Sequence, residues 1–188
     1  IGDGFDPSLG FVPRTGVWIV SAGARHRIRS PKPWLRSVVF EALPSLFTDL
    51  EGKWETYKVS LTPFDWTLES GDRFLASFTP EGEVLKEPFE IADGVAIPVG
   101  EYHWSRARAE VTTAPKRTVS GGTSVSVGGF YDGTLGQVAV RLLLQPSATG
   151  SLELTAERNA GDLPAGDFTQ DLASARLAAS PGISLVKR

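Results

Sequence analysis

Two-residue alternation of apolar and polar side chains, repeated along most of the chain, is the feature that most limits what this sequence can fold into. A strand points successive side chains to opposite faces, so such alternation is typical of a sheet with one apolar and one polar face. Helical spacing is nearly absent, and 20 Gly and 13 Pro separate the alternating runs. The sequence therefore predicts an all-β protein, with about ten strands in a single domain over residues 1–188.

Most of the predicted strands are about 8 to 13 residues long, which suits tilted transmembrane strands of about 9 to 11 residues better than the shorter strands of soluble sheets. The connections also alternate in length. Short turns are expected at "SPKP", "ESGD", "APKR", "QPSATG" and "SPG", with "GGFYDG" as a short exception among longer loops at residues 43–53, 80–101 and 160–168. This order is typical of an antiparallel up-and-down outer-membrane β-barrel. We expect a barrel segment that is a fragment of a larger transmembrane barrel.

The run from Trp54 to Leu68 changes phase in its middle. Tyr57, Val59 and Leu61 share one phase, and Phe64, Trp66 and Leu68 share the opposite one. An extra residue in a strand shifts the alternation and is tolerated next to proline, so we expect a β-bulge near Pro63.

Charged residues gather in the polar phase of the predicted strands, while Ala, Val, Leu and aromatic residues occupy the other phase. In a barrel the apolar phase meets lipid and the polar phase faces the interior. In a soluble sandwich the same charged residues would face water. Under the barrel interpretation the interior is lined by Arg25, Arg27, Lys58, Arg106, Arg108, Glu110, Arg141, Glu153 and Arg176.

All tryptophans lie within about three residues of an end of a predicted strand. Membrane barrels place aromatic side chains there as interfacial girdles, whereas soluble β-proteins use tryptophan in cores and at edges. The barrel interpretation predicts five interfacial residues: Trp18, Trp34, Trp54, Trp66 and Trp104.

The composition excludes several classes of function. There is no Cys, which removes disulfides, thiolate metal sites and a cysteine nucleophile. A net charge of −3 gives no basic field, so nucleic acid is not an expected partner. His26 and His103 lack the spacing of metal ligands, and no catalytic motif is present. We predict no catalytic, metal or cofactor site and assign no enzymatic activity to this chain.

The start of the chain predicts a fragment or a processed piece of a longer protein. No Met is present and the chain opens on Ile1 without a signal-peptide pattern, so we expect a piece of a longer protein. No window of about 18 apolar residues predicts a transmembrane helix.

The stretch "LKEPFEIADGVAIPVGEYHW" (residues 85–104) is interrupted by Pro and Gly too often for a long strand. We expect an external loop that folds over the barrel rim or meets an upstream domain. Its reversal is predicted at "ADGV", and its own apolar cluster at Phe89, Ile91, Val95 and Ile97.

Three motifs in order, "GFVPRTG", "LKEPFEIADGVAIPVGEY" and "GGFYDG", resemble the C-terminal region of an uncharacterised bacterial family. In that family a domain similar to carbohydrate-binding family nine precedes an outer-membrane β-barrel. The resemblance covers residues 10–179, with 1–9 as a lead-in and 180–188 as a strand cut short. It implies a location in the bacterial outer membrane. The sequence departs from other barrels in its poorly alternating second strand and in lacking a terminal aromatic-ended strand, so the missing strands are expected from the rest of the parent chain.

These observations favour a membrane anchor or conduit for an upstream carbohydrate-binding-like domain. The expected partners are the lipid bilayer, the remainder of the parent chain and, by the family resemblance, a saccharide. The alternative is a soluble β-sandwich that binds carbohydrate on Trp54, Trp66 and Trp104, with its apolar faces packed as one core. A secreted β-rich hydrolase lacks a convincing acid, base or nucleophile set.

Overall fold

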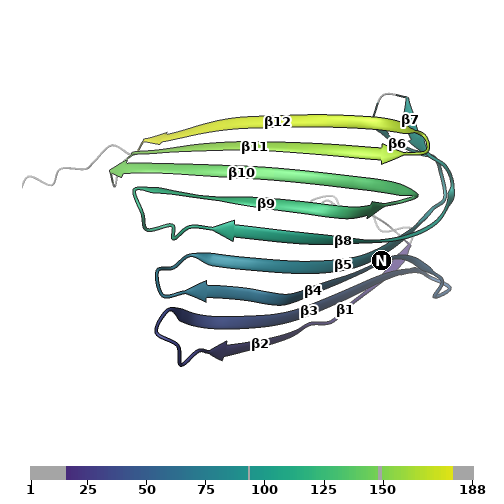
Figure 1. Ribbon diagram of the computed structural model, residues 1–188. Coiled ribbons are helices and arrows are strands. Elements are labelled where there is room, and N and C mark those ends of the chain that lie inside the picture. The colour runs from purple at the N-terminus through teal and green to yellow at the C-terminus, as the bar shows by residue number, and fades with distance from the viewer. Residues whose placement is uncertain (1–15, 93, 148–149, 180–188) are drawn as a thin grey trace, which may run out of the picture.

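The computed structural model describes residues 16–92, 94–147 and 150–179, nearly all of which lie in strands. Long strands joined by short connections make one curved sheet (Figure 1). The strands are β1 (Val17–Ser21), β2 (Ala24–Arg29), β3 (Leu35–Asp49), β4 (Trp54–Leu68), β5 (Arg73–Leu85), β6 (Phe89–Ala92), β7 (Val95–Ile97), β8 (Gly100–Thr112), β9 (Val119–Phe130), β10 (Gly133–Ser147), β11 (Gly150–Leu163) and β12 (Gly166–Ala179).

Ten of these strands form a single antiparallel sheet in the order β1-β3-β4-β5-β8-β9-β10-β11-β12, with β2 also paired to β3. Apart from β2, spatial order follows chain order, as in an up-and-down meander. The prediction of an all-β, antiparallel up-and-down fold with about ten strands is confirmed. The sheet is open among the described residues, since β12 lies at one edge and β1 with β2 at the other.

The predicted alternation of short turns and long loops is wrong for two of the three long loops. Residues 43–49 belong to β3, and only residues 50–53 connect it to β4. Residues 160–163 and 166–168 belong to β11 and β12, so residues 164–165 alone connect these strands. The connection from β5 to β8 is long, although β5 runs on to Leu85 and shortens it to residues 86–99.

The predicted bulge near Pro63 is confirmed. The pairing of β4 with β5 shifts register between Leu61 and Phe64. Because of this shift, Tyr57 and Trp66 lie on the same face of the sheet although their phases in the sequence are opposite. The segment predicted as a strand cut short, within residues 180–188, lies outside the described residues, as does the lead-in at residues 1–9.

The connection between β5 and β8 contains a hairpin of its own, β6 with β7. Gly94, at the reversal, has a φ of 75°, which glycine adopts without strain. The hairpin lies against the start of β12 and therefore far across the sheet from β5 (Figure 1). We call this end of the sheet the hairpin end. The opposite end, where β2 joins β3, β4 joins β5 and β8 joins β9, is the turn end.

Candidate functional site: the two faces of the sheet

The pairing register divides the side chains of the sheet into two faces. Residues paired directly across an antiparallel ladder point to the same face. By this rule all nine charged residues predicted for the interior share one face, which we call the polar face. The other is the apolar face, with side chains such as Phe40, Phe74, Val125, Val140 and Leu154.

Burial is inverted relative to a water-soluble sheet. The side chains of Ser120, Ser124 and Ser126 on the polar face of β9 are buried, whereas Val125 and Val127 on its apolar face are 43% and 54% exposed. Buried polar residues elsewhere in the described sheet, namely Ser37, Asp65 and Asn159, also lie on the polar face. No second sheet covers the apolar face among the described elements. Large apolar side chains are thus left open, and small polar ones are shielded.

The polar face is tied together by a hydrogen-bonded ladder across four strands. Arg106 on β8 donates to Ser126 on β9 at 3.2 Å and also to the side chain of Gln137 on β10. Gln137 donates to Asn159 on β11 at 2.7 Å, and Asn159 donates to Glu157 at 3.0 Å. Such a network satisfies polar groups that are shielded from solvent and would otherwise be costly to bury. Nε of Arg106 is the exception, since it is buried without a hydrogen-bond partner among the described residues.

Ion pairs extend this pattern over the rest of the polar face. Oppositely charged neighbours on a sheet face attract one another, so a surface rich in arginine is balanced locally. The pairs are Arg25 with Glu41 at 3.6 Å, Lys58 with Glu81 at 2.9 Å, Arg73 with Asp65 at 2.6 Å, Arg108 with Glu110 at 2.7 Å and Arg141 with Glu153 at 2.6 Å.

A groove of about 820 Å³ runs over the turn end of the polar face. Its lining combines these charges with hydroxyl groups, including Arg108, Glu110, Ser124, Thr155 and Ser174, and with apolar side chains such as Leu143 and Leu172. It contains no aromatic side chain on which a sugar ring could stack.

The hairpin end of the polar face has a different character. The most deeply buried large side chain of the described residues is Ile97 of β7, which is 1% exposed, and Val95 beside it is also buried. Leu135 and Leu163, at polar-face positions of β10 and β11, are buried at the same end. A small apolar core therefore replaces the polar lining where the hairpin lies.

Contacts with aromatic residues fix the hairpin on the polar side of the sheet. Phe89 lies 6.4 Å from the ring of Tyr131, whose hydroxyl donates to Glu83 at 2.8 Å, and Tyr102 donates to the Pro98 carbonyl at 2.9 Å. Glu83 and Tyr102 are paired positions of the polar face. The predicted apolar cluster of the stretch is thus divided, because Val95 and Ile97 are buried while Phe89 is 47% exposed and meets Tyr131.

Four of the five tryptophans lie at the ends of the sheet on or beside its apolar face. At the turn end Trp34 and Trp66 have ring centroids 6.5 Å apart. At the hairpin end Trp18 is 60% exposed, and Trp54 packs 5.1 Å from His103. The four tryptophans therefore form two groups, one at each end of the sheet.

Trp104 differs from the other tryptophans. It pairs with Glu81 and so shares the polar face with Lys58 and Arg106, where it packs 4.8 Å from Tyr131. Its Nε1 group is buried without a hydrogen-bond partner among the described residues. An outward interfacial position, as predicted for this residue, does not match this location.

The apolar face also carries an ion pair between β11 and β12. Arg158 donates to Asp171 through Nε and Nη2, both at 2.7 Å. Beyond this pair toward the hairpin end, the same face carries Asp162 and Thr169, whereas toward the turn end it carries only apolar residues on β12, such as Ala173 and Leu177. The two side chains bond to each other, which neutralises both charges on this face.

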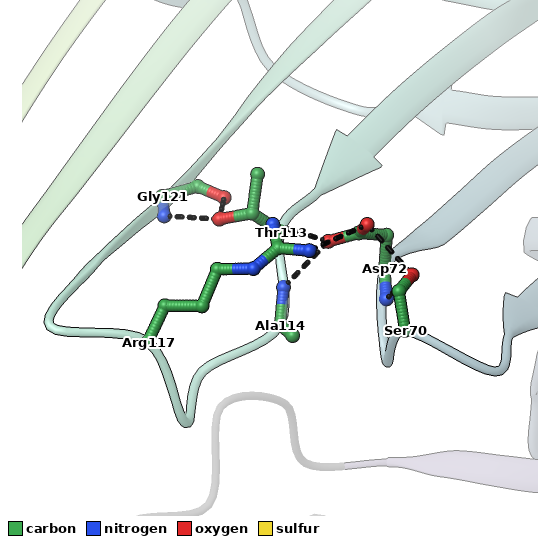
Figure 2. Close-up of polar contacts among 6 residues, drawn as sticks. All are labelled: Ser70, Asp72, Thr113, Ala114, Arg117 and Gly121. Carbon is green, nitrogen blue, oxygen red and sulfur yellow. Dashed lines mark hydrogen bonds and ion pairs between the residues drawn. The ribbon is translucent and has the colours of Figure 1, made fainter.

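At the turn end a carboxylate links two neighbouring turns (Figure 2). Asp72 accepts hydrogen bonds from Arg117 and from the Ala114 backbone N–H, both at 2.9 Å, and from the Ser70 hydroxyl at 2.7 Å. These contacts, chiefly the one from Arg117, lower the pKa of Asp72 from 3.8 to about 2. Thr113 completes the cluster by bonding with the Gly121 backbone, so the turns between β4 and β5 and between β8 and β9 are held together.

Within the described residues, no group of three or more His, Asp or Glu side chains could hold a metal ion. No helix of the described part is long and apolar enough to span a membrane. No family model matches the chain, and neither the curated proteins nor the solved structures compared with it give a match. The family resemblance based on the three sequence motifs stays a prediction.

Proposed function

We propose that this chain is the membrane-spanning sheet of a bacterial outer-membrane protein. The apolar face would lie against lipid and the polar face toward the interior of a barrel, so that the sheet anchors an upstream domain or forms part of a conduit. The observation that carries this proposal is the inverted burial, with exposed valines and leucines on one face and shielded, mutually bonded polar groups on the other.

Strand length supports the same proposal. The main strands from β3 to β12 contain 12 to 15 residues. At about 3.3 Å per residue and a tilt of about 40°, a strand of about 14 residues rises about 35 Å along the membrane normal. This exceeds the apolar band of about 25 Å and leaves room for aromatic residues such as Trp66 and Trp54 at its two borders.

A soluble β-sandwich that binds carbohydrate is the alternative. Such a fold packs two sheets through their apolar faces. The described elements supply one large sheet and a small hairpin on the polar side, so a partner for the apolar face is missing from this part of the chain. In a sandwich the large side chains of the apolar face would be buried in the core. Here several of them are exposed, namely Phe64, Phe78, Val127 and Val138.

The upstream carbohydrate-binding-like domain, and a saccharide as ligand of the parent protein, belong to this proposal only through the sequence resemblance. The groove on the polar face offers hydroxyl and charged groups to a polar solute but no aromatic platform. A saccharide would therefore be captured by the upstream domain rather than by this sheet.

The proposal is tested on the product of the complete gene. It should sediment with outer membranes, resist extraction by alkaline carbonate and require detergent for solubility. It should also migrate differently on SDS gels before and after boiling, because folded barrels resist the detergent. A product that stays monomeric in plain buffer and migrates at one position under both conditions would rule out membrane insertion.

A further inference from the structure

The strands at the two edges of the large sheet run in the same direction, although one edge is the single strand β12 and the other consists of the two short strands β1 and β2. β1 and β2 both pair antiparallel with β3, along its residues 45–49 and 37–42, and so act as one interrupted pass. The sheet has ten strands, and counting β1 with β2 as one pass leaves nine. Neighbouring passes are all antiparallel, so the first and the ninth, which is β12, point the same way.

Direct closure of this sheet would therefore join β12 to the β1 and β2 edge in parallel. Parallel neighbours need a long crossover connection, and bacterial barrels made of a single chain contain an even number of antiparallel strands. An antiparallel seam on each side requires an odd number of additional passes.

The same parity excludes a second copy of this sheet as the sole partner. Two copies with the same orientation in a membrane would again present β12 to the β1 and β2 edge in parallel. Two copies related by a two-fold axis could pair β12 with β12 in antiparallel fashion. They would then place the turn that contains Asp72 on opposite sides of the membrane, which an oriented membrane protein does not do.

We propose that the edge strand β12 pairs with a further strand of the same polypeptide, antiparallel to it, and that the number of passes added to the nine is odd. The inference rests on the proposed function, since an open strand edge is not tolerated in a bilayer. The same polypeptide is the source because, from β3 to β12, each strand of the large sheet pairs with the one that follows it in the chain.

The side chains of β12 specify the chemistry of that strand. Leu177, Ala175 and Ala173 lie on the apolar face, and Arg176 and Ser174 on the polar face. Its partner must alternate in the same phase, with apolar residues outward.

The guanidinium of Arg176 adds a specific requirement. Its neighbour across the pair with β11 is Glu153, which is already engaged by Arg141 at 2.6 Å. Within the described residues Arg176 makes no ion pair. Five other cations of the polar face, namely Arg25, Lys58, Arg73, Arg108 and Arg141, each have an acidic partner on that face. An acidic residue opposite Arg176 on the added strand would extend the same pattern.

Hydrogen exchange of the complete gene product in detergent micelles tests the pairing. Amides of β12 should exchange at least about 100-fold more slowly than those of an unpaired edge, at rates like those of β11. Strands β10 and β11, each paired on both sides, give the protected reference in the same protein. Fast exchange of every second amide of β12 beside protected amides in β10 and β11 would overturn the inference.

Cysteine variants separate the two sources of a partner strand. Since the chain has no native Cys, Ala175→Cys and Ser174→Cys place a single thiol on the apolar and the polar side of β12. Neither should yield disulfide-linked dimers under mild oxidation, whereas dimers would show that a second copy occupies the edge. Membrane extraction of the same samples keeps the two proposals apart: loss of insertion refutes the membrane function, while normal insertion with an unprotected or dimeric β12 refutes only this inference.

Discussion

A charge placed in the middle of the apolar face should be costly if that face meets lipid and nearly neutral if it meets water. Val140 is the central residue of the 15-residue strand β10, is 49% exposed, and is paired with Thr123 and Ala156. These two neighbours are small, so Val140→Arg introduces charge with little crowding. The substitution therefore probes the surroundings of the face rather than its packing.

The expected magnitude follows from depth. When β10 is centred in the bilayer, Val140 lies near the midplane, where an arginine on the lipid side of a barrel costs about 2 to 4 kcal/mol. That is about a 30- to 900-fold shift toward the unfolded state. Thr134, on the same face and six residues away, lies about 15 Å nearer the interface at a tilt of about 40°, where the cost is about 0 to 1 kcal/mol.

A matched control lies next to Val140 on the other face. Ala139 is paired with Glu157 and borders the groove, so Ala139→Arg adds a cation beside an anion in open space. The three variants are compared by guanidinium unfolding of the complete protein from phospholipid vesicles. The destabilisation should rank Val140→Arg well above Thr134→Arg and Ala139→Arg. Values for Val140→Arg within about 0.5 kcal/mol of the wild type, as for ordinary exposed sites, would refute the assignment of this face to lipid.

Three further outcomes are expected. The lowered pKa of Asp72 means that its contribution to stability is complete above about pH 4 and lost as the pH falls to about 2. Asp72→Asn should remove this part of the acid dependence of urea unfolding, and equal acid profiles for wild type and Asp72→Asn would contradict it. Ile97→Ala should make residues 86–99 more sensitive to limited proteolysis than Phe89→Ala does, because Ile97 is buried and Phe89 is half-exposed. Deletion of residues 87–100 should spare membrane insertion, and failure to insert would count against a location at the barrel rim. Gly128→Ala should destabilise the fold by about 1 to 3 kcal/mol in chemical denaturation, because Gly128 has a φ of 151° and an added Cβ would collide with the Ser105 carbonyl oxygen. An unchanged denaturation midpoint would contradict this prediction and show that β9 can move away from β8.

The two faces could be predicted from sequence because the period of a strand is fixed at two residues. Even the change of phase at Pro63 was readable, since a bulge is the physical way for a strand to exchange its faces. Alternation alone therefore placed residues as distant as Arg25 and Arg176 on one side of a single sheet.

Proline and glycine do not mark loops where they lie inside strands, and for this reason two of the predicted long loops are too long. Pro44 lies inside β3 although it has no backbone N–H to donate. Its carbonyl accepts a hydrogen bond from the Ala22 N–H, so the missing donor faces the gap between β1 and β2, where the ladder is interrupted. Gly161 weakens β11 by itself, but the ring of Phe168 on β12 covers it closely. Pairing of Gly161 with Phe168 would indicate a continuous strand at this glycine. That pairing depends on a turn of only two residues, 164–165, which the sequence alone does not define.

Trp104 illustrates a different limit. Its spacing of two residues from Arg106 assigns it to the polar phase, and this phase, rather than closeness to a strand end, decides the face on which it lies. The sequence does not predict the contact between Trp104 and Tyr131. Tyr131 is a non-glycine residue with a φ of 52°, and its ring packs against that of Trp104. Positive φ at such a residue is uncommon and is held by its surroundings, here by the hydrogen bond to Glu83.

The location of the hairpin distinguishes the two roles proposed for the sheet. Its buried residues Val95 and Ile97 lie at the same end of the polar side as the buried Leu135 and Leu163, whereas the groove at the turn end is lined by charged, hydroxyl and apolar side chains. A solute passing along the polar face would meet this apolar core and would require the hairpin to leave it. An anchor requires no such movement, and the core then brings the connection after β5 against the start of β12, across the span of the sheet. The anchoring role is thus the simpler of the two, and conduction would depend on release of the contacts around Ile97.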